Sequence, residues 1–107
     1  MLPREVKVGP LTFRVASGGE VVDFFRGADE DAGDCDSDGL TIRINTLELA
    51  DGNHRDTLLH EVVHAVLFER AVNLTTKQEE DVARNLGTGL LAVLRDNPEL
   101  IEYLTDG

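Results

Sequence analysis

The segment that decides the fold reads TLLHEVVHAV and covers residues 57–66. Its apolar residues recur three and four positions apart, which predicts a helix with one face buried against the rest of the chain. His60 and His64 are four residues apart, so both imidazoles leave the same face of that helix, one turn from each other. This spacing lets two neutral imidazole nitrogens reach one tetrahedral metal ion. Glu61 flanks the same site and can take a proton from a water molecule without displacing a ligand.

The signals around this segment give its limits. Asn53 can cap a helix, and Asp56 lies three residues later, where the positive end of the helix favours an acid. We therefore expect the helix to run from Asn53 to about Arg70. A second helix start is indicated at Thr75-Thr76, where Thr76 and Glu79 have the spacing of a capping box, so Thr76 is the expected capping residue.

The apolar stripe of this second helix consists of Val82, Leu86, Leu90, Val93 and Leu94. Pro98 ends the helix within a residue or two, and residues 99–104 have the composition of one further helical turn.

Upstream of the helices the period of the sequence is two. Apolar residues alternate with polar ones on both sides of Gly9-Pro10, which predicts two short strands and a tight turn, and again over Thr41–Asn45. Residues 21–25 form an apolar cluster whose secondary structure the sequence does not indicate. We expect a single α+β domain over residues 1–107: a small N-terminal antiparallel or mixed sheet, the helix with the histidines, and a second packed helix.

A zinc site with a catalytic role needs a third protein ligand. One large class of zinc proteases carries it six residues after the second histidine, following a glycine, but Leu67 and Arg70 occupy those positions and exclude that class. The remaining candidates are acids at the start of the second helix, which a helical hairpin would bring back to the first. We favour Glu80, with Glu79 as the alternative, because the expected capping box would occupy Glu79 and because Ala83 and Gly87 follow Glu80 on one face.

The pattern over residues 57–66 resembles the signature of zincin-like metallopeptidases. The whole chain is also similar to small metallopeptidases encoded by phages and prophages, through the N-terminal hairpin, the GDCD segment at residues 33–36, the motif helix and the Glu79-Glu80 pair. The resemblance implies a zincin-like fold, a Zn²⁺ ion held by His60, His64 and Glu80 or Glu79, and Glu61 as catalytic base and acid.

The resemblance also implies a peptide or protein substrate. Zincins commonly pair an extended substrate with an edge strand beside the motif helix, and Thr41–Asn45 is the natural candidate here. Three residues are candidates to stabilise the oxyanion: His54, Arg84 and Tyr103. Two alternative functions stay open: a catalytically silent zinc-binding interaction module, and a regulatory peptidase with one protein substrate.

A second metal site has to be considered. Residues 34–39 carry acids at alternate positions, Asp34, Asp36 and Asp38, and a glycine sixth, as in the first half of a calcium-binding loop. The twelfth position is Asn45 instead of glutamate, so the alternative is a solvated turn entering a strand. Cys35, in the same segment, also has two interpretations: an inert side chain, or a reactive thiol or metal ligand.

Composition limits the partners. The chain has 107 residues, with 21 Asp and Glu against 10 Lys and Arg and a formal net charge of −11. This excess of acid argues against binding to nucleic-acid phosphates or anionic membrane surfaces. No uncharged stretch of the C-terminal half approaches the ~20 residues that span a bilayer. The N-terminus lacks the apolar core of a signal peptide, and a single cysteine cannot form an internal disulfide, so we expect a cytoplasmic protein. The oligomeric state is left open.

Overall fold

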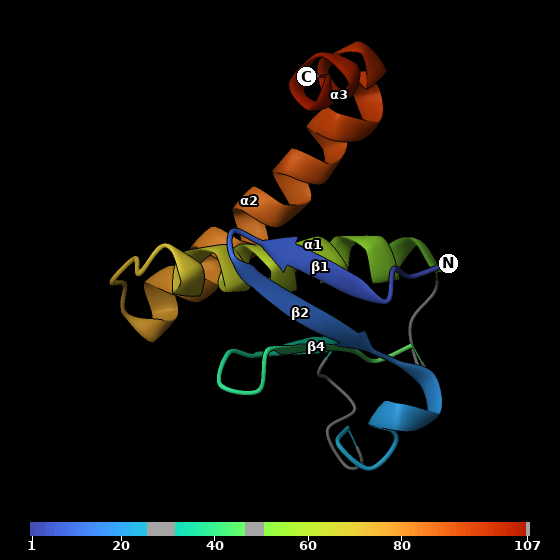
Figure 1. Cartoon of the computed structure of the whole chain (residues 1–107), viewed down its shortest axis with the longest axis vertical. Coiled ribbons are helices and arrows are strands. Elements are labelled where there is room, and N and C mark those ends of the chain that lie inside the picture. The colour runs from blue at the N-terminus through green and yellow to red at the C-terminus, as the bar shows by residue number, and fades with distance from the viewer. Residues whose placement is uncertain (26–31, 47–50, 107) are drawn as a thin grey trace.

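A small sheet, a helix laid against one face of it and a second helix crossing the first make up the body of the molecule (Figure 1). The computed structural model describes residues 1–25, 32–46 and 51–106. The order of elements is α+β, with strands first and helices last, as the sequence predicts. The described residues form four strands and three α-helices, where the sequence indicates three strands, two helices and one further helical turn.

The N-terminal hairpin is confirmed. Strands β1 (Glu5–Val8) and β2 (Leu11–Ala16) pair antiparallel, with Val8 opposite Leu11 across the turn. Strand β4 (Thr41–Ile44) lies parallel to β2, and strand β3 (Gly33–Asp36) lies antiparallel to β4. The sheet is therefore mixed, in the order β1-β2-β4-β3.

This order corrects one prediction about the edge of the sheet. Thr41–Ile44 is a strand, but it lies between β2 and β3, and the terminal strand on that side is β3. The backbone of β4 is thus already paired on both sides and cannot take up another strand. The cause is a hairpin that inserts β4, the later of its two strands, next to β2.

Helix α1 (Asp51–Glu69) covers the sheet with the apolar face that its period predicts. Leu58, Val62 and Ala65 pack on a core from three strands that contains Phe13, Ile42 and Ile44, all of them fully buried. The expected start at Asn53 is wrong, because the helix already includes Asp51 and Asn53 lies inside it. Ala16, Val21 and Phe25 form a separate small cluster.

Helix α2 (Thr76–Asp96) begins one residue earlier than the expected capping box places it. Its cap is Thr75, whose hydroxyl accepts from the Gln78 amide while the Gln78 side chain accepts from the Thr75 amide. Ala83 and Gly87 are its buried residues and face α1. A final helix, α3 (Pro98–Thr105), extends the single turn that the sequence predicts.

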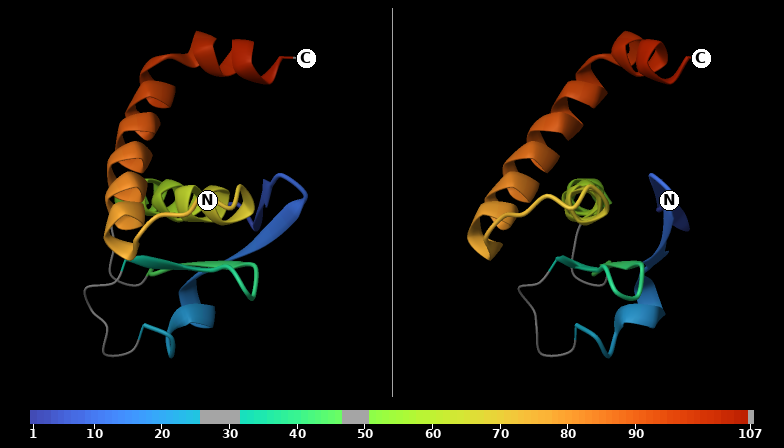
Figure 2. Two further views of the ribbon diagram at one scale, coloured as in Figure 1. Left: turned by 90° about the vertical axis from the view of Figure 1, so that its left-hand side faces the viewer. Right: turned by 60° about the vertical axis from the view of Figure 1, so that its left-hand side comes forward.

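The predicted apolar stripe of α2 is largely uncovered. Leu86, Leu90 and Val93 are all exposed, because α2 packs on α1 through its small residues instead. Beyond the crossing with α1, α2 projects away from the body and carries α3 at its far end (Figure 2). Among the described residues no helix combines the length and apolar character required to cross a membrane.

Candidate metal centre

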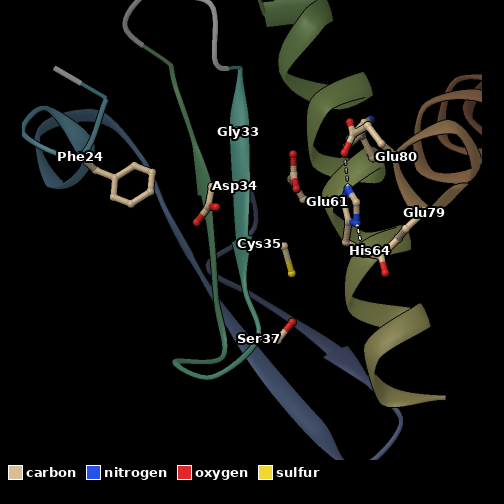
Figure 3. Close-up of a pocket in the computed structure, with 10 residues that line it drawn as sticks. Phe24, Gly33, Asp34, Cys35, Ser37, Glu61, His64, Glu79 and Glu80 are labelled. Atoms are coloured by element: carbon tan, nitrogen blue, oxygen red, sulfur yellow. Dashed lines mark hydrogen bonds and ion pairs between the residues drawn. The ribbon is translucent and has the colours of Figure 1, made fainter. Parts of the chain in front are cut away.

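His60, Glu61 and His64 lie on the part of α1 that turns from the sheet towards α2. Because Leu58, Val62 and Ala65 fix the rotation of α1 on the sheet, His60 and His64 contact α2, and Glu61 points from α1 towards β3 (Figure 3). One ligand atom from each of the three residues lies within 4.8 Å of the others. Glu61 is only 6% exposed, whereas both imidazoles are half-buried. The predicted triplet is thus brought together at the surface of a cleft.

Both candidate carboxylates of α2 reach this triplet. Glu80 spans the two imidazoles: its Oε1 lies 2.9 Å from His60 Nε2, and its Oε2 lies 3.2 Å from His64 Nε2. Glu79 contacts the other nitrogen of the second imidazole, with Oε2 at 2.6 Å from His64 Nδ1 (Figure 3). The two acids therefore occupy different places, and Glu80 is the one that faces both Nε2 atoms.

The start of α2 explains this arrangement. Because Gln78 fills the capping box, neither Glu79 nor Glu80 is occupied there, and the sequence argument that Glu79 is held by a cap is wrong. The other argument is confirmed: Ala83 and Gly87 are buried against α1, and they lie on the same face of α2 as Glu80. The close approach of the helices carries Glu80 to the histidines.

The two ring nitrogens of His64 have surroundings that are compatible with a bound cation. A neutral imidazole carries a proton on only one nitrogen, yet both nitrogens of His64 face carboxylate oxygens. If Nδ1–H donates to Glu79, the lone pair of Nε2 points at Glu80, and a proton or a metal ion has to lie between them. Burial lowers the pKa of His60 below 6.5, more than the neighbouring Glu80 raises it. A metal ion that binds neutral imidazole suits this environment.

A cleft of about 510 Å³ lies between these residues and β3. From the sheet side it is lined by Gly33, Asp34, Cys35 and Ser37, with Phe24 at its margin. Two further hollows share residues with it. One of about 480 Å³ lies beyond His64 and has an apolar wall that includes Leu67, Phe68 and Val72, and one of about 360 Å³ lies beyond His60 and is lined by Asp56, Thr57 and Arg84.

Cys35 lines the cleft but is not part of the group that could hold a metal. Burial raises the pKa of its thiol to about 11, and the Glu61, Asp34 and Asp36 carboxylates add to that shift while a hydrogen bond with Ser37 opposes it. A thiol held protonated is a poor nucleophile and a poor ligand. The inert interpretation is the one that fits this environment.

Two acids of the alternative calcium loop, Asp34 and Asp36, have other partners. Asp34 and Asp36 lie on β3, where Arg43 of β4 contacts both, at 2.6 Å and 3.5 Å. Asp36 also accepts from the Gly39 amide at 3.0 Å, and this hydrogen bond, with Arg43, lowers the pKa of its carboxyl group. These contacts stabilise β3 and the turn at Gly39. The segment that resembles part of a calcium-binding loop therefore belongs to the hairpin of β3 and β4.

Of the three candidates for an oxyanion donor, only Arg84 lies beside the centre. It lines the hollow next to His60, with its Nη1 3.4 Å from Asp81 Oδ1. His54 lies in a separate hollow formed with the N-terminal residues, and Tyr103 is 80% exposed on α3.

Sequence reasoning missed the sheet side of the site. Gly33 lies so close to α1 that a Cβ built on it would meet the Thr57 methyl group at 2.8 Å and Glu61 Oε2 at 3.1 Å. The signal that was available is the pair Asp34 and Arg43, which face each other across β3 and β4 as an acid and a base. Read together with the turn at Gly39, this pair indicates a hairpin.

Comparisons with models of protein families, with curated proteins and with solved structures found no match. The resemblance to zincin-like metallopeptidases stays a prediction.

Proposed function

We propose that this chain is a zinc-dependent peptidase of the zincin-like type. The observation that supports it most is the convergence of His60 Nε2, His64 Nε2 and the Glu80 carboxylate beside the buried Glu61. Two imidazoles and one carboxylate are a ligand set that catalytic zinc commonly takes, with a further position left for water or substrate.

The spacing of these atoms is compatible with zinc. Ligands held ~2.0–2.1 Å from a tetrahedral ion lie ~3.3 Å from one another. The Glu80 oxygens are 2.9 and 3.2 Å from the two Nε2 atoms, which is close to that spacing. Glu79 would act on the outer side, by accepting the Nδ1 proton of His64 and so directing the Nε2 lone pair at the ion.

Glu61 has the position of a general base and acid. A zinc ion held by the three ligands would supply a Lewis acid that activates water and polarises the scissile carbonyl group. The Glu61 carboxylate borders the same cleft, and it would accept the proton of the attacking water and deliver it to the leaving amine. Arg84, beside His60, would offset the developing negative charge.

The substrate would bind as an added strand on β3. This strand is terminal in the described sheet and forms one wall of the cleft. It would therefore be the strand that pairs with the substrate, in place of Thr41–Asn45. An extended peptide there would pass across the histidines and Glu61. The hollow with Leu67, Phe68 and Val72 would take an apolar side chain on the His64 side.

The test has two arms, metal content and hydrolysis. We expect about one zinc per chain by elemental analysis in the wild type and in Glu61→Gln, and cleavage of unfolded protein or peptide mixtures by the wild type alone. Bound zinc without cleavage of any peptide, or of any protein in a cell extract, would favour a silent zinc-binding module. A wild-type protein that takes up no added zinc would refute the proposal.

A further inference from the structure

Strand β3 has backbone groups that face away from its partner strand. The Asn45 amide donates to the Ala32 carbonyl oxygen at 2.9 Å, so residues 32 and 45 form a hydrogen-bonded pair at the end of the antiparallel ladder of β3 and β4. Hydrogen-bonded and non-hydrogen-bonded pairs alternate along such a ladder. The even-numbered residues of β3 therefore bond to β4, whereas the N–H and C=O groups of Gly33 and Cys35 point to the free edge.

The ladder on the other side of β4 gives the same assignment. The Arg14 amide of β2 donates to the Leu40 carbonyl oxygen at 2.9 Å. Because successive residues of a strand direct their backbone groups to opposite sides, the odd-numbered residues of β4 face β3. These residues lie opposite the even-numbered residues of β3 in the register of the two strands. Both ladders thus leave the backbone groups of Gly33 and Cys35 without a partner strand in the described sheet.

The side chains of β3 alternate between the two faces of the sheet. Gly33 and Cys35 lie opposite Ile44 and Ile42, which are fully buried in the core beneath α1. A peptide added at the free edge would follow the same alternation. Its residues opposite Gly33 and Cys35 would direct their side chains towards α1 and the cleft, and the residue between them would direct its side chain to the other face.

The cleft continues past the candidate metal centre at both ends of β3. The hollow beyond His60 is lined by Gly33, at the start of the strand, and the hollow beyond His64 is lined by Ser37, just after its end. Both hollows share residues with the central cleft. A site that removes single terminal residues has to stop the chain beside the reacting bond, whereas this cleft continues in both directions. A peptide paired along β3 would have chain on both sides of the metal centre.

We propose that the site cuts internal bonds of an extended peptide segment that pairs with the outward backbone groups of Gly33 and Cys35. This inference rests on the proposed peptidase function, to which it adds a register and a class of substrate. Main-chain hydrogen bonds supply the affinity for an added strand, and side chains at alternate positions supply the selectivity. Gly33 and Cys35 are thus positioning residues, and the substrate is an unfolded segment within a longer chain.

The first test compares two pools of the same short peptides, one with free termini and one with acetylated N-termini and amidated C-termini. The zinc-loaded wild type should cut both pools at interior bonds, which mass spectrometry of the products would locate. Removal of single residues from free termini alone would overturn the inference and leave the peptidase function in place. Cleavage of neither pool, nor of an unfolded protein, would count against the peptidase function itself.

Amide hydrogen exchange, followed by NMR, tests the register. In zinc-loaded Glu61→Gln, the Gly33 and Cys35 amides should exchange faster than the amides of the two aspartates of β3, which donate to β4. A blocked peptide that the wild type cuts should, at saturation, slow exchange at Gly33 and Cys35 at least about 10-fold. Unchanged exchange at both residues, while the signals of His64 report that the peptide is bound, would overturn the register.

A pair of variants at one position isolates the backbone group. Cys35→Pro removes the outward N–H and leaves the bonds to β4, since an edge strand tolerates proline where its N–H faces solvent. Cys35→Val is the matched control, because it replaces the same side chain and keeps the N–H. The KM for the blocked peptide should be about 5-fold higher in the proline variant than in the valine variant at similar kcat, as expected for one lost hydrogen bond. Equal KM values would overturn the pairing, and the exchange measurement decides the register if the proline variant does not fold.

Discussion

Gly87 of α2 lies directly on the backbone of His60 of α1. A Cβ built at Gly87 would be 3.2 Å from both the Cα and the N atom of His60. The residue that lets the helices touch is therefore opposite the first histidine of the site, and Glu80 lies two turns away on the same face of α2. Spacing between the helices and geometry of the candidate metal centre are coupled at this contact.

Replacement of Gly87 by valine should consequently impair zinc binding. Overpacking at such a contact costs typically ~1–3 kcal/mol and pushes the helices apart. We expect a zinc affinity at least about 10-fold weaker, measured by competition with a chromogenic chelator. Gly89→Val is the control, since it makes the same change in the same helix where a Cβ meets nothing within 4 Å. Equal affinity in the two variants would refute the coupling.

The two glutamates should have separable effects. Glu80→Gln removes the carboxylate that faces both Nε2 atoms, and zinc affinity should fall by more than about 100-fold. Glu79→Gln leaves an oxygen that can accept from His64 Nδ1, so the loss should stay within the ~10–100-fold range seen for partners of a ligand. The order of the effects is decisive: a larger loss in Glu79→Gln would make Glu79 the ligand.

The stability of the metal-free protein should fall in mild acid because of His60. Its pKa is lowered below 6.5 by burial, so below that pH the unfolded chain binds a proton that the folded chain does not. The free energy of unfolding should therefore decrease as the pH falls from 6.5, measured with urea after chelation. His60→Asn should lack this component of the decrease. An NMR titration that places His60 at or above 6.5 in the folded chain would contradict it.

Cys35 should react slowly with alkylating agents. Raising the thiol pKa from 9.0 to about 11 lowers the thiolate fraction at pH 8 by about 100-fold. The rate of modification by iodoacetamide, followed by mass spectrometry, should fall by a similar factor relative to the chain in urea. Equal rates in the folded and the urea-unfolded chain would show that the thiol is not held protonated.

Substitution of Gly33 should disturb the approach of β3 to Glu61. A Cβ there would meet the Thr57 methyl group at 2.8 Å and the Arg43 carbonyl oxygen at 3.0 Å, so Gly33→Ala should destabilise the fold by about 1–3 kcal/mol. Thr57→Ser removes that methyl group and should recover part of the loss in the double variant. Additive effects in urea unfolding would show that the two residues do not interact.

The parts of this structure that follow from the sequence are those with a strong local pattern. The hairpin around Gly9-Pro10 and the helix with His60 and His64 each repeat one period over many residues. Strand β3 does not, since its residues are Gly33-Asp34-Cys35-Asp36, and it forms because Arg43 and the backbone of β4 pair with it. Its existence depends on a partner strand, which residue order alone does not display.

Helix α2 shows a different limit of sequence reasoning. The stripe that contains Leu86, Leu90 and Val93 predicts the packed face, but the face that packs carries Ala83 and Gly87. Small residues let the backbones of two helices approach each other closely, and a pattern of large apolar residues does not indicate such a contact. The capping box lies one residue earlier than predicted, because the pair Thr75 and Gln78 has the same spacing as the pair Thr76 and Glu79.

The shortness and charge of β3 also bear on whether this sheet edge pairs with the edges of identical chains. A free sheet edge invites identical chains to add strand upon strand, and natural proteins prevent this with short edge strands and charged side chains. Here the edge has four residues, two of them aspartates. A second chain offering the same edge would bring its own aspartates against these, so growth of the sheet into fibres is disfavoured, while a peptide without that charge meets no such repulsion.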